Sequence, residues 1–203
     1  MSVFAPWVGA DYAQQSVKIL LLDESHDFLD NTGQRVDFTQ SVIGDVKKYN
    51  APKWGKTRMF SRIFFALTGK KGEDVSLEEW AVFWDGIAFY NYLQSAKLKD
   101  PRNGIPPELW LKSKQAFFEV VKELQPDLVL AFGHELFGKI WEMKEKKHLD
   151  AHHLDLLIPG LRKPIRVIKF RHPSSPRFKF SESHTLVTEA VAAKTQEDLG
   201  KSP

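Results

Sequence analysis

Four short apolar runs, of which the first three are almost continuously apolar, constrain the fold of this chain more than any other feature of its sequence. The runs lie at 17–22, 86–90, 128–132 and 165–170. Apolar runs of this length are typical of strands that are buried on both faces of a parallel sheet. The longer stretches between them show the periodicity of helices. We therefore expect an α/β fold, a three-layer sandwich with a central four-stranded parallel sheet between helices.

The helices that we expect lie between or after these runs, roughly at 39–49, 57–68, 77–84, 108–124, 135–147 and 183–199. Pro106 and Pro107 favour a helix start, and Pro126 after Gln125 favours a helix end. The expected loops lie at 28–37, 70–76, 97–104, 148–162 and 201–203. The 203 residues show no internal repeat and no low-complexity linker, so we expect one domain over 1–203.

The chain contains no cysteine, which excludes disulfides, thiolate zinc sites, iron–sulfur clusters and cysteine nucleophiles. No apolar run approaches the roughly 18 residues that a membrane span needs. The N-terminal stretch does not combine a basic start with an apolar run, so it does not resemble a secretory signal. We expect a cytoplasmic monomer with no membrane partner, no metal and no cofactor.

The positive charge of the chain is concentrated in one segment. The formal net charge is only +3, but 7 of the 29 basic residues lie between Leu161 and Phe180, where there is no acidic residue. The rest of the chain carries 22 basic and 26 acidic residues and is net acidic. Such a segment is typical of a surface that binds phosphate. It fits equally well a solvated strand end along which long basic side chains extend.

Polar and titratable residues follow each of the four expected strands. The segments are Asp23 to Asp27, Asn91 and Tyr92, Gly133 to Glu135, and Arg171 to Pro176. The carboxyl ends of parallel strands meet at one edge of a sheet, and ligands of such folds bind there. We therefore expect these groups to gather in one place, which favours an active site at that edge.

Several other kinds of site do not match the sequence. No glycine-rich phosphate-binding motif of the NAD or P-loop type follows a strand. The histidines and aspartates at 148–155 have no established zinc spacing, so a polar, solvated loop explains them better. Glu24, Ser25 and His26 lack the glycines of a serine hydrolase nucleophile turn. The turn from His172 to Pro176 either presents an imidazole and two hydroxyls at the sheet edge or only caps the last helix.

The order of these segments resembles the uracil-DNA glycosylase superfamily. Members of that family carry a GQDPYH- or GEAPG-type motif after the first strand and an HPSPLS-type motif after the last. Here the segment 20–26, LLLDESH, stands at the first place, and the segment 172–178, HPSSPRF, stands at the second. The segment 84–91, WDGIAFYN, ends where the family has a base-reading asparagine. The resemblance covers nearly the whole chain and implies the family's four-stranded parallel sheet between helices.

The resemblance also implies a reaction. A base is flipped out of DNA into the pocket, and its N-glycosidic bond is then hydrolysed. His172 is expected to donate a hydrogen bond to a carbonyl of the departing base. Asn91 is expected to read the edge of the base. Glu24, at the position of the acid in the GEAPG branch, is expected to position or deprotonate the attacking water.

Further roles follow from the same resemblance. Phe38 is expected to stack on the flipped base, with a core aromatic as the alternative interpretation. The expected DNA contacts come from the last motif and its surroundings: Arg171, Ser174, Ser175, Arg177 and Phe178. The two serines would hold phosphates, and Arg177 or Phe178 would take the place of the wedge that fills the vacated base stack.

The first motif departs from the family at three positions. Asp23 replaces a glycine beside which the substrate passes, Ser25 stands where one branch has a catalytic aspartate, and His26 replaces a proline. We expect all three residues to contact the substrate. Because the uracil pocket of the family is shaped by other residues, a bulkier base, hydroxylated or glycosylated as in some phage DNA, becomes an alternative substrate.

The sequence thus leads to a monofunctional DNA glycosylase that acts on uracil or another modified pyrimidine, in DNA repair or in defence against phage. Two other interpretations stay open. One is a non-catalytic relative that binds nucleic acid through the basic segment. The other is an α/β enzyme that acts on a small molecule and has no affinity for DNA.

Overall fold

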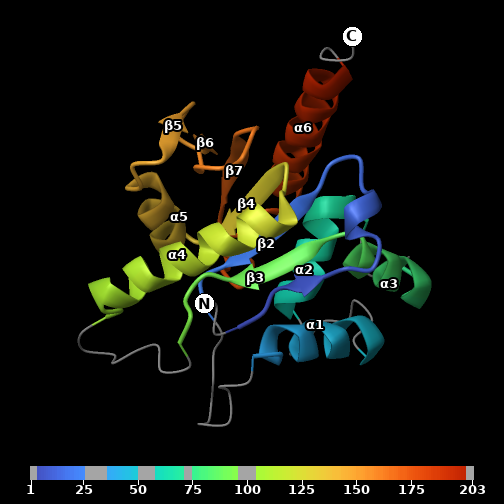
Figure 1. The fold of residues 1–203 in the computed structure, drawn as a ribbon. Coiled ribbons are helices and arrows are strands. Elements are labelled where there is room, and N and C mark those ends of the chain that lie inside the picture. The colour runs from blue at the N-terminus through green and yellow to red at the C-terminus, as the bar shows by residue number, and fades with distance from the viewer. Residues whose placement is uncertain (1–3, 26–35, 50–57, 71–74, 96–103, 200–203) are drawn as a thin grey trace.

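The computed structural model describes residues 4–25, 36–49, 58–70, 75–95 and 104–199. At its centre lies one mixed sheet of seven strands in the order β1-β3-β2-β4-β7-β6-β5 (Figure 1). The strands are β1 (Trp7–Val8), β2 (Ile19–Asp23), β3 (Ala88–Asn91), β4 (Leu128–Phe132), β5 (Lys146–His148), β6 (His153–Leu156) and β7 (Ile165–Phe170). The chain is α/β, as expected.

The four central strands coincide with the four apolar runs of the sequence. β3, β2, β4 and β7 pair in this order, and every pair is parallel. Leu21 of β2 lies beside Phe89 of β3 and Leu130 of β4. β3 and β4 are buried at every position because helices cover both faces of the sheet, and this burial explains their continuous hydrophobicity.

Three antiparallel strands extend the sheet at its two edges, so the expected number of four strands is wrong. β1 pairs with β3 over only two residues, and β6 pairs with β7 at the opposite edge. β5 and β6 form a hairpin whose turn and second strand lie in the segment 148–162, which we expected to be a loop. β6 did carry a signal, because buried Leu154 and Leu156 alternate with half-buried polar residues.

The helix expected at 135–147 is shorter than its sequence indicates. α5 covers only His134–Trp141. The lysines and glutamates that follow favour a helix by propensity, but Lys146–His148 pair with β6 instead, so strand pairing overrides propensity. Asp150 closes the hairpin, since its Oδ1 accepts hydrogen bonds from the backbone N–H groups of His152 at 2.7 Å and His153 at 3.0 Å.

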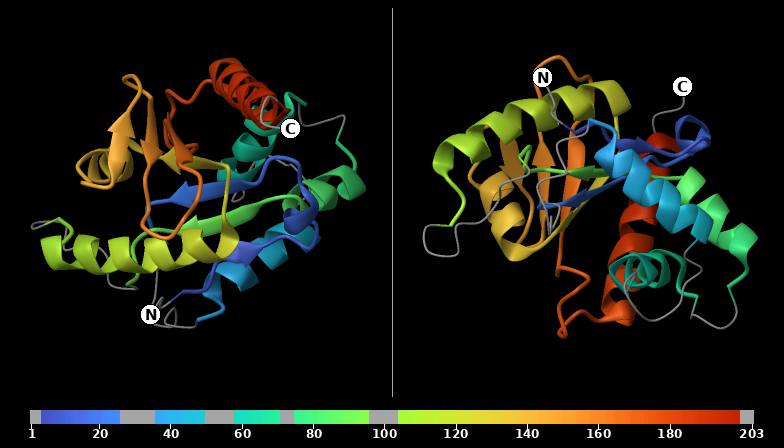
Figure 2. Two further views of the ribbon diagram at one scale, coloured as in Figure 1. Left: turned by 45° about the horizontal axis from the view of Figure 1, so that its top comes forward. Right: turned by 90° about the horizontal axis from the view of Figure 1, so that it is seen from below.

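Helices cover both faces of the sheet, which gives the expected three layers (Figure 2). One face carries α4 (Pro107–Leu124) and α5, and the other carries α1 (Phe38–Tyr49), α2 (Arg58–Thr68), α3 (Leu77–Asp85) and α6 (Phe180–Leu199). α6 begins at Phe180, earlier than expected, and lies beside α2. A short 3₁₀ helix, η1 (Tyr12–Gln14), precedes β2.

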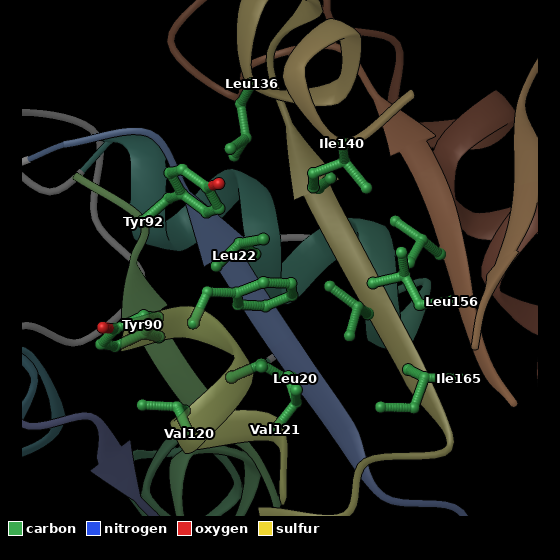
Figure 3. Packing of buried hydrophobic residues seen from close by; sticks show 14 of the residues in the cluster. Leu20, Leu22, Tyr90, Tyr92, Val120, Val121, Leu136, Ile140, Leu156 and Ile165 are labelled. Carbon is green, nitrogen blue, oxygen red and sulfur yellow. The ribbon is translucent and has the colours of Figure 1, made fainter. Parts of the chain in front are cut away.

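The pleat of the central strands divides the core into two layers. Leu20 and Leu22 of β2 belong to the layer under α4 and α5, and Leu21 belongs to the other layer. Figure 3 shows the first layer, in which these leucines lie among side chains such as Val121 of α4 and Ile140 of α5. Each fully buried leucine stabilises the fold by about 1.5–3 kcal/mol. The two layers therefore hold the strands in register and bring their carboxyl ends to one edge.

Local signals set the ends of several helices. α4 begins at Pro107 and is closed by Gln125 in the left-handed region, with φ 46°. α3 begins with a capping box, in which Ser76 and Glu79 each bind the other's backbone N–H. In the part of the chain that the structure describes, no helix is long and apolar enough to cross a membrane.

Candidate active site

The carboxyl ends of the parallel strands frame a cavity of about 660 Å³. β2 ends at Asp23 and β3 ends at Asn91, and these two residues are register partners. Seven of the residues singled out from the sequence line this cavity: Asp23, Glu24, Ser25, Phe38, Asn91, His172 and Ser174. Segments that lie far apart in the sequence therefore meet at one site.

Asp23 and His172 are 149 positions apart in the chain and contact each other at the cavity wall. Nε2 of His172 lies 3.1 Å from Oδ1 of Asp23. The same Oδ1 accepts a hydrogen bond from the backbone N–H of Glu24 at 2.9 Å. The side chain of Asp23 is only 7% exposed, so a buried carboxylate holds the imidazole where the resembling family has a glycine.

The second ring nitrogen of His172 is held by the turn that follows β7. The backbone N–H of Ser174 donates to Nδ1 at 3.1 Å, so Nδ1 carries no proton and Nε2 carries the ring hydrogen. The N–H of Ser175 donates to the carbonyl oxygen of His172 at 2.9 Å and tightens the turn. The result is a neutral imidazole whose N–H is directed at Asp23.

A buried arginine that the sequence did not reveal supports this turn. Arg62 of α2 is 5% exposed, and its Nη1 donates to the carbonyl oxygens of Pro173 at 2.6 Å and Ser175 at 2.9 Å. Among the described residues, its Nε has no hydrogen-bond partner. Desolvation and then the neighbouring cation Arg58 lower the pKa of Arg62 from its ordinary value. The one available signal was a lone arginine in the apolar helical run 58–68, where a charge needs a partner.

Hydrogen bonds fix the backbone at Glu24 and Asn91. The N–H of Leu93 donates to the carbonyl oxygen of Glu24 at 2.9 Å, so the pairing of β2 and β3 continues beyond both strands. Asn91 is 1% exposed, and its carbonyl oxygen accepts a hydrogen bond from Nε2 of Gln94 at 2.8 Å. Backbone hydrogen bonds therefore hold the first motif and Asn91 next to each other in the absence of a ligand.

The apolar wall of the cavity is largely aromatic. Phe38, the first residue of α1, is half-buried and lines the cavity. Phe60, Phe89 and Phe132 line it too, and the ring centroids of Phe60 and Phe89 lie 6.1 Å apart. No sequence pattern singled out these three rings, because aromatic residues within helical and strand runs usually indicate core.

The residues that follow β4 complete the cavity. Gly133, His134 and Glu135 all line it, and Gly133 has φ 107°, which favours glycine. This turn lets α5 begin at His134 directly after the strand. Desolvation, followed by the positive charges of Lys169 and Arg171, lowers the pKa of His134 below its ordinary value of 6.5. His134 is therefore neutral at pH 7.

The residues expected to contact DNA lie in and around the turn after β7. Arg171, Ser174 and Arg177 are exposed there, and Ser175 is half-buried. Phe178 is only 6% exposed and packs against the ring of Phe180 at 5.7 Å between centroids. Because Phe178 serves the core, Arg177 is the exposed residue at the place expected for the wedge.

The basic segment does not form one surface. β7 has six residues and is therefore about 20 Å long. Arg162 and Lys163 precede it and line a separate cavity at the opposite edge of the sheet. Arg166, within the strand, lies 2.5 Å from Asp155. Only the C-terminal part of the segment flanks the candidate site, because β7 places the two ends of the segment at opposite edges of the sheet.

Two other expectations concern His26 and the histidines and aspartates at 148–155. His26, expected to contact the substrate, lies outside the described residues. The histidines and aspartates at 148–155 belong to the β5–β6 hairpin, where His153 Nδ1 lies 2.8 Å from Asp150. Over the described ranges, no three His, Cys, Asp or Glu side chains are grouped so that they could hold a metal ion.

No model of a known protein family and no curated protein matches this sequence. A function for the chain has to be inferred from the cavity and from the side chains that line it.

Proposed function

We propose that this protein is a monofunctional DNA glycosylase, which turns an altered pyrimidine out of DNA, cleaves its N-glycosidic bond and leaves an abasic site. One observation carries the proposal. Glu24, Asn91 and His172 follow or end three different strands, and all three line one cavity of about 660 Å³. A glycosylase needs its base-reading, water-activating and leaving-group residues around a single base.

The cavity offers the contacts that a flipped base requires. The amide of Asn91 has both a donor and an acceptor for the edge of the base. Phe38 and Phe60 provide aromatic rings, and stacking a base on such a ring is worth about 1–3 kcal/mol. This stacking offsets part of the few kcal/mol that unpairing and unstacking the base cost.

Hydrolysis adds one water molecule across the glycosidic bond. The bond between the sugar C1′ and the base nitrogen breaks, both of its electrons go to the base, and the water oxygen bonds to C1′. Glu24 positions the water and takes one of its protons, which passes in the end to the base nitrogen, so that atoms and charge balance. General-base assistance of this kind contributes about 10²–10⁴-fold to the rate.

His172 acts on the departing base. Its Nε2–H donates to a carbonyl oxygen of the base while negative charge develops there. In the free protein this N–H is directed at Oδ1 of Asp23, 3.1 Å away, so a bound base has to share it with the carboxylate. The amide of Ser174 keeps Nδ1 unprotonated, which suits a ring that donates a hydrogen bond as a neutral group.

The surface beside the cavity suits a DNA backbone. Arg171, Ser174 and Arg177 are exposed next to the cavity, and within the described ranges they form no ion pair of the kind that Arg166 makes at the other end of β7. Contacts of cations with phosphates release counterions, so binding to DNA is expected to weaken steeply as salt rises. Arg177 takes the wedge role in this proposal because Phe178 is buried.

Incubation with a panel of oligonucleotides tests the proposal. Single- and double-stranded DNA, each with one altered base, is treated with the protein, and abasic sites are then cleaved with alkali. The panel contains uracil and hydroxymethylated and glucosylated pyrimidines. We expect cleavage for at least one base, and preference for a phage-type base would favour a role in defence over repair. No product from any substrate, with a folded protein, would contradict the proposal.

A second candidate is a non-catalytic protein that binds nucleic acid. The Asp23–His172 contact favours it, because it occupies the N–H that catalysis needs. In this case DNA binding is expected to depend on salt and to survive Glu24→Ala, and no product forms from any substrate. Excision of one base from the panel would exclude this candidate.

A further inference from the structure

Basic side chains from three neighbouring segments gather at the carboxyl edge of the sheet. The pairing of β4 with β7 continues beyond β4, because the N–H of Gly133 donates to the carbonyl oxygen of Phe170 at 2.9 Å. The pairing of β6 with β7 also continues, because the N–H of Lys169 donates to the carbonyl oxygen of His152 at 2.8 Å. The ends of these segments carry four residues, called the basic cluster below: His134, His152, Lys169 and Arg171.

Electrostatic effects within the basic cluster show that its members are close together. Desolvation, and then the charges of Lys169, Arg171 and His152, lower the pKa of His134. His134 also lines the candidate site, so the cluster lies at the rim of that cavity. Nζ of Lys169 lies 5.5 Å from the centroid of the Phe137 ring, which places this ammonium group on the face of the sheet that α5 covers.

The protein does not neutralise the basic cluster. Over the described ranges, no side chain of the cluster forms an ion pair with a carboxylate. Lysine and arginine are ordinarily protonated at neutral pH, so Lys169 and Arg171 carry two positive charges. Lys169 is half-buried, and partial burial of a cation without an anionic partner is costly. An anionic ligand at the rim would offset this cost.

The acidic residues on the same segments do not supply that anion. On the hairpin, Asp150 contacts His153 at 2.8 Å, and Asp155 contacts Arg166 at 2.5 Å. Glu135 of α5 is exposed and lines the cavity, but in the described part of the chain it forms no ion pair with the cluster. The anion that matches the cluster therefore has to come from a ligand.

The basic cluster and the turn after β7 approach the cavity from opposite faces of the sheet. Arg62 of α2 binds the turn, whereas Lys169 contacts α5, and these two helices cover different faces (Figure 2). His134 of the cluster and Ser174 of the turn both line the cavity. A strand of DNA whose base enters the cavity thus has polar or basic groups on both sides of it.

We infer that the basic cluster binds a phosphate of the DNA strand that carries the flipped base, on the α5 side of the cavity, while the turn after β7 holds the strand on the α2 side. The inference rests on the proposed glycosylase function and adds a second contact with the DNA backbone. Lys169 and Arg171 supply positive charge, and His134 and His152 supply ring N–H donors. Phosphate oxygens accept such hydrogen bonds, which position the strand without reading its sequence.

A duplex with a tetrahydrofuran analogue of an abasic site tests the inference, because it requires no knowledge of the base. Fluorescence anisotropy measures its affinity over a range of salt concentrations. We expect Lys169→Gln to weaken binding about tenfold and to make the slope of log affinity against log salt shallower by about one. Lys169→Arg keeps the cation and should restore the wild-type slope. Arg162→Gln is the matched control, since it removes an exposed cation at the opposite edge and should leave the slope unchanged.

Neutral methylphosphonates, placed one at a time around the abasic analogue, locate the contact. At one position the substitution should weaken wild-type binding about tenfold but have little further effect on Lys169→Gln, because both changes remove the same contact. Thermal unfolding checks that Lys169→Gln is folded, and Arg171→Gln serves as the second variant if it is not.

The inference and the glycosylase function can fail separately, because binding and excision are measured in different assays. The inference is overturned by a wild-type salt slope in the folded variants, by an equal effect of Arg162→Gln, by methylphosphonate effects that add at every position, or by no binding of the wild type. Excision from the oligonucleotide panel with any of these results would leave the function standing. A contact at one phosphate without any excision would support the phosphate site and remove the function.

Discussion

The two edges of the parallel sheet use charged residues in opposite ways. At the amino edge, Arg166 lies 2.5 Å from Asp155 and 3.8 Å from Glu197, and Lys194 lies 3.5 Å from the same Glu197. These four residues line a cavity of about 200 Å³. The charges of these four residues are matched by one another.

At the carboxyl edge, beside a cavity of about 660 Å³, the buried side chains of Asp23 and Arg62 are bonded to uncharged groups among the described residues. In the described part of the chain, Arg62 is bonded to two backbone carbonyl oxygens and to no carboxylate. Asp23 is bonded to a neutral imidazole and a backbone N–H. Burial of a charge without a partner is costly, and proteins keep such groups mainly where they serve a site. The contrast separates ion pairs that stabilise the fold from buried charges that position the residues of the candidate site.

Removal of the imidazole at the carboxyl edge should have the largest effect among the variants that test this contrast. We expect His172→Ala to slow excision by about 10- to 100-fold, because a hydrogen bond to a developing charge is worth about 1.5–3 kcal/mol. Single-turnover kinetics measure it. His153→Ala is the matched control, since His153 also contacts an aspartate, Asp150, but on the distant hairpin. Equal excision rates for His172→Ala and His153→Ala would contradict the claim that the carboxyl edge of the sheet carries the site.

Arg62→Met tests the support under the His172 turn. The variant leaves the carbonyl oxygens of Pro173 and Ser175 without their donor, so we expect the free energy of unfolding to fall by about 1–3 kcal/mol. Urea denaturation measures this change, and the excision rate should fall with it because the turn positions His172. Arg58→Met, at an exposed position on the same helix, should change the stability by less than about 0.5 kcal/mol. Full stability of Arg62→Met would show that the buried cation is dispensable.

Arg166→Gln should affect stability alone. The Arg166 side chain is 27% exposed, and its ion pairs with Asp155 and Glu197 are partly solvated, so we expect a loss of at most about 1 kcal/mol. Excision should proceed at the wild-type rate, because this edge takes no part in the site. If Arg166→Gln had normal stability but slower excision, the amino edge would contribute to the excision reaction.

The pH dependence of stability gives the smallest effect. The pKa of His134 is lowered in the folded protein, so the unfolded chain binds this proton more readily. The stability that the neutral ring preserves is present above its ordinary pKa of 6.5 and is lost as the pH falls through the lower folded value. The difference in unfolding free energy between the wild type and His134→Gln should therefore shift against the wild type from pH 7.5 to pH 5.5. A constant difference would assign no such role to His134.

The sequence revealed the central strands because burial on both faces leaves a pattern that needs no knowledge of the tertiary structure. It did not reveal β1, which has only two residues, or β5, whose lysines favour a helix until β6 pairs with them. The basic segment was misleading in a similar way. Nearness along the chain suggested one surface, whereas β7 places its two ends at opposite edges of the sheet.

The candidate site was predictable as a place but not as a set of contacts. The edge rule for parallel sheets located Glu24, Asn91 and His172 without any structure. The contact between Asp23 and His172 joins residues 149 positions apart, and no local pattern encodes it. Arg62 was overlooked for another reason, because it lies in a run of apolar residues whose helical spacing indicates core. Only the fold shows that its guanidinium reaches the turn of the second motif.

Abasic-site formation in natural DNA tests the central claim most directly, because it requires no knowledge of the base. Bulk DNA from hosts and phages with unmodified and modified pyrimidines is incubated with the wild type and with Glu24→Gln, and abasic sites are labelled with an aldehyde-reactive probe. We expect label in at least one DNA with the wild type, forming about 10²–10⁴-fold more slowly with Glu24→Gln. No label in any DNA from a folded wild-type protein, or equal label from the two proteins, would contradict the assignment of the cavity as a glycosylase site.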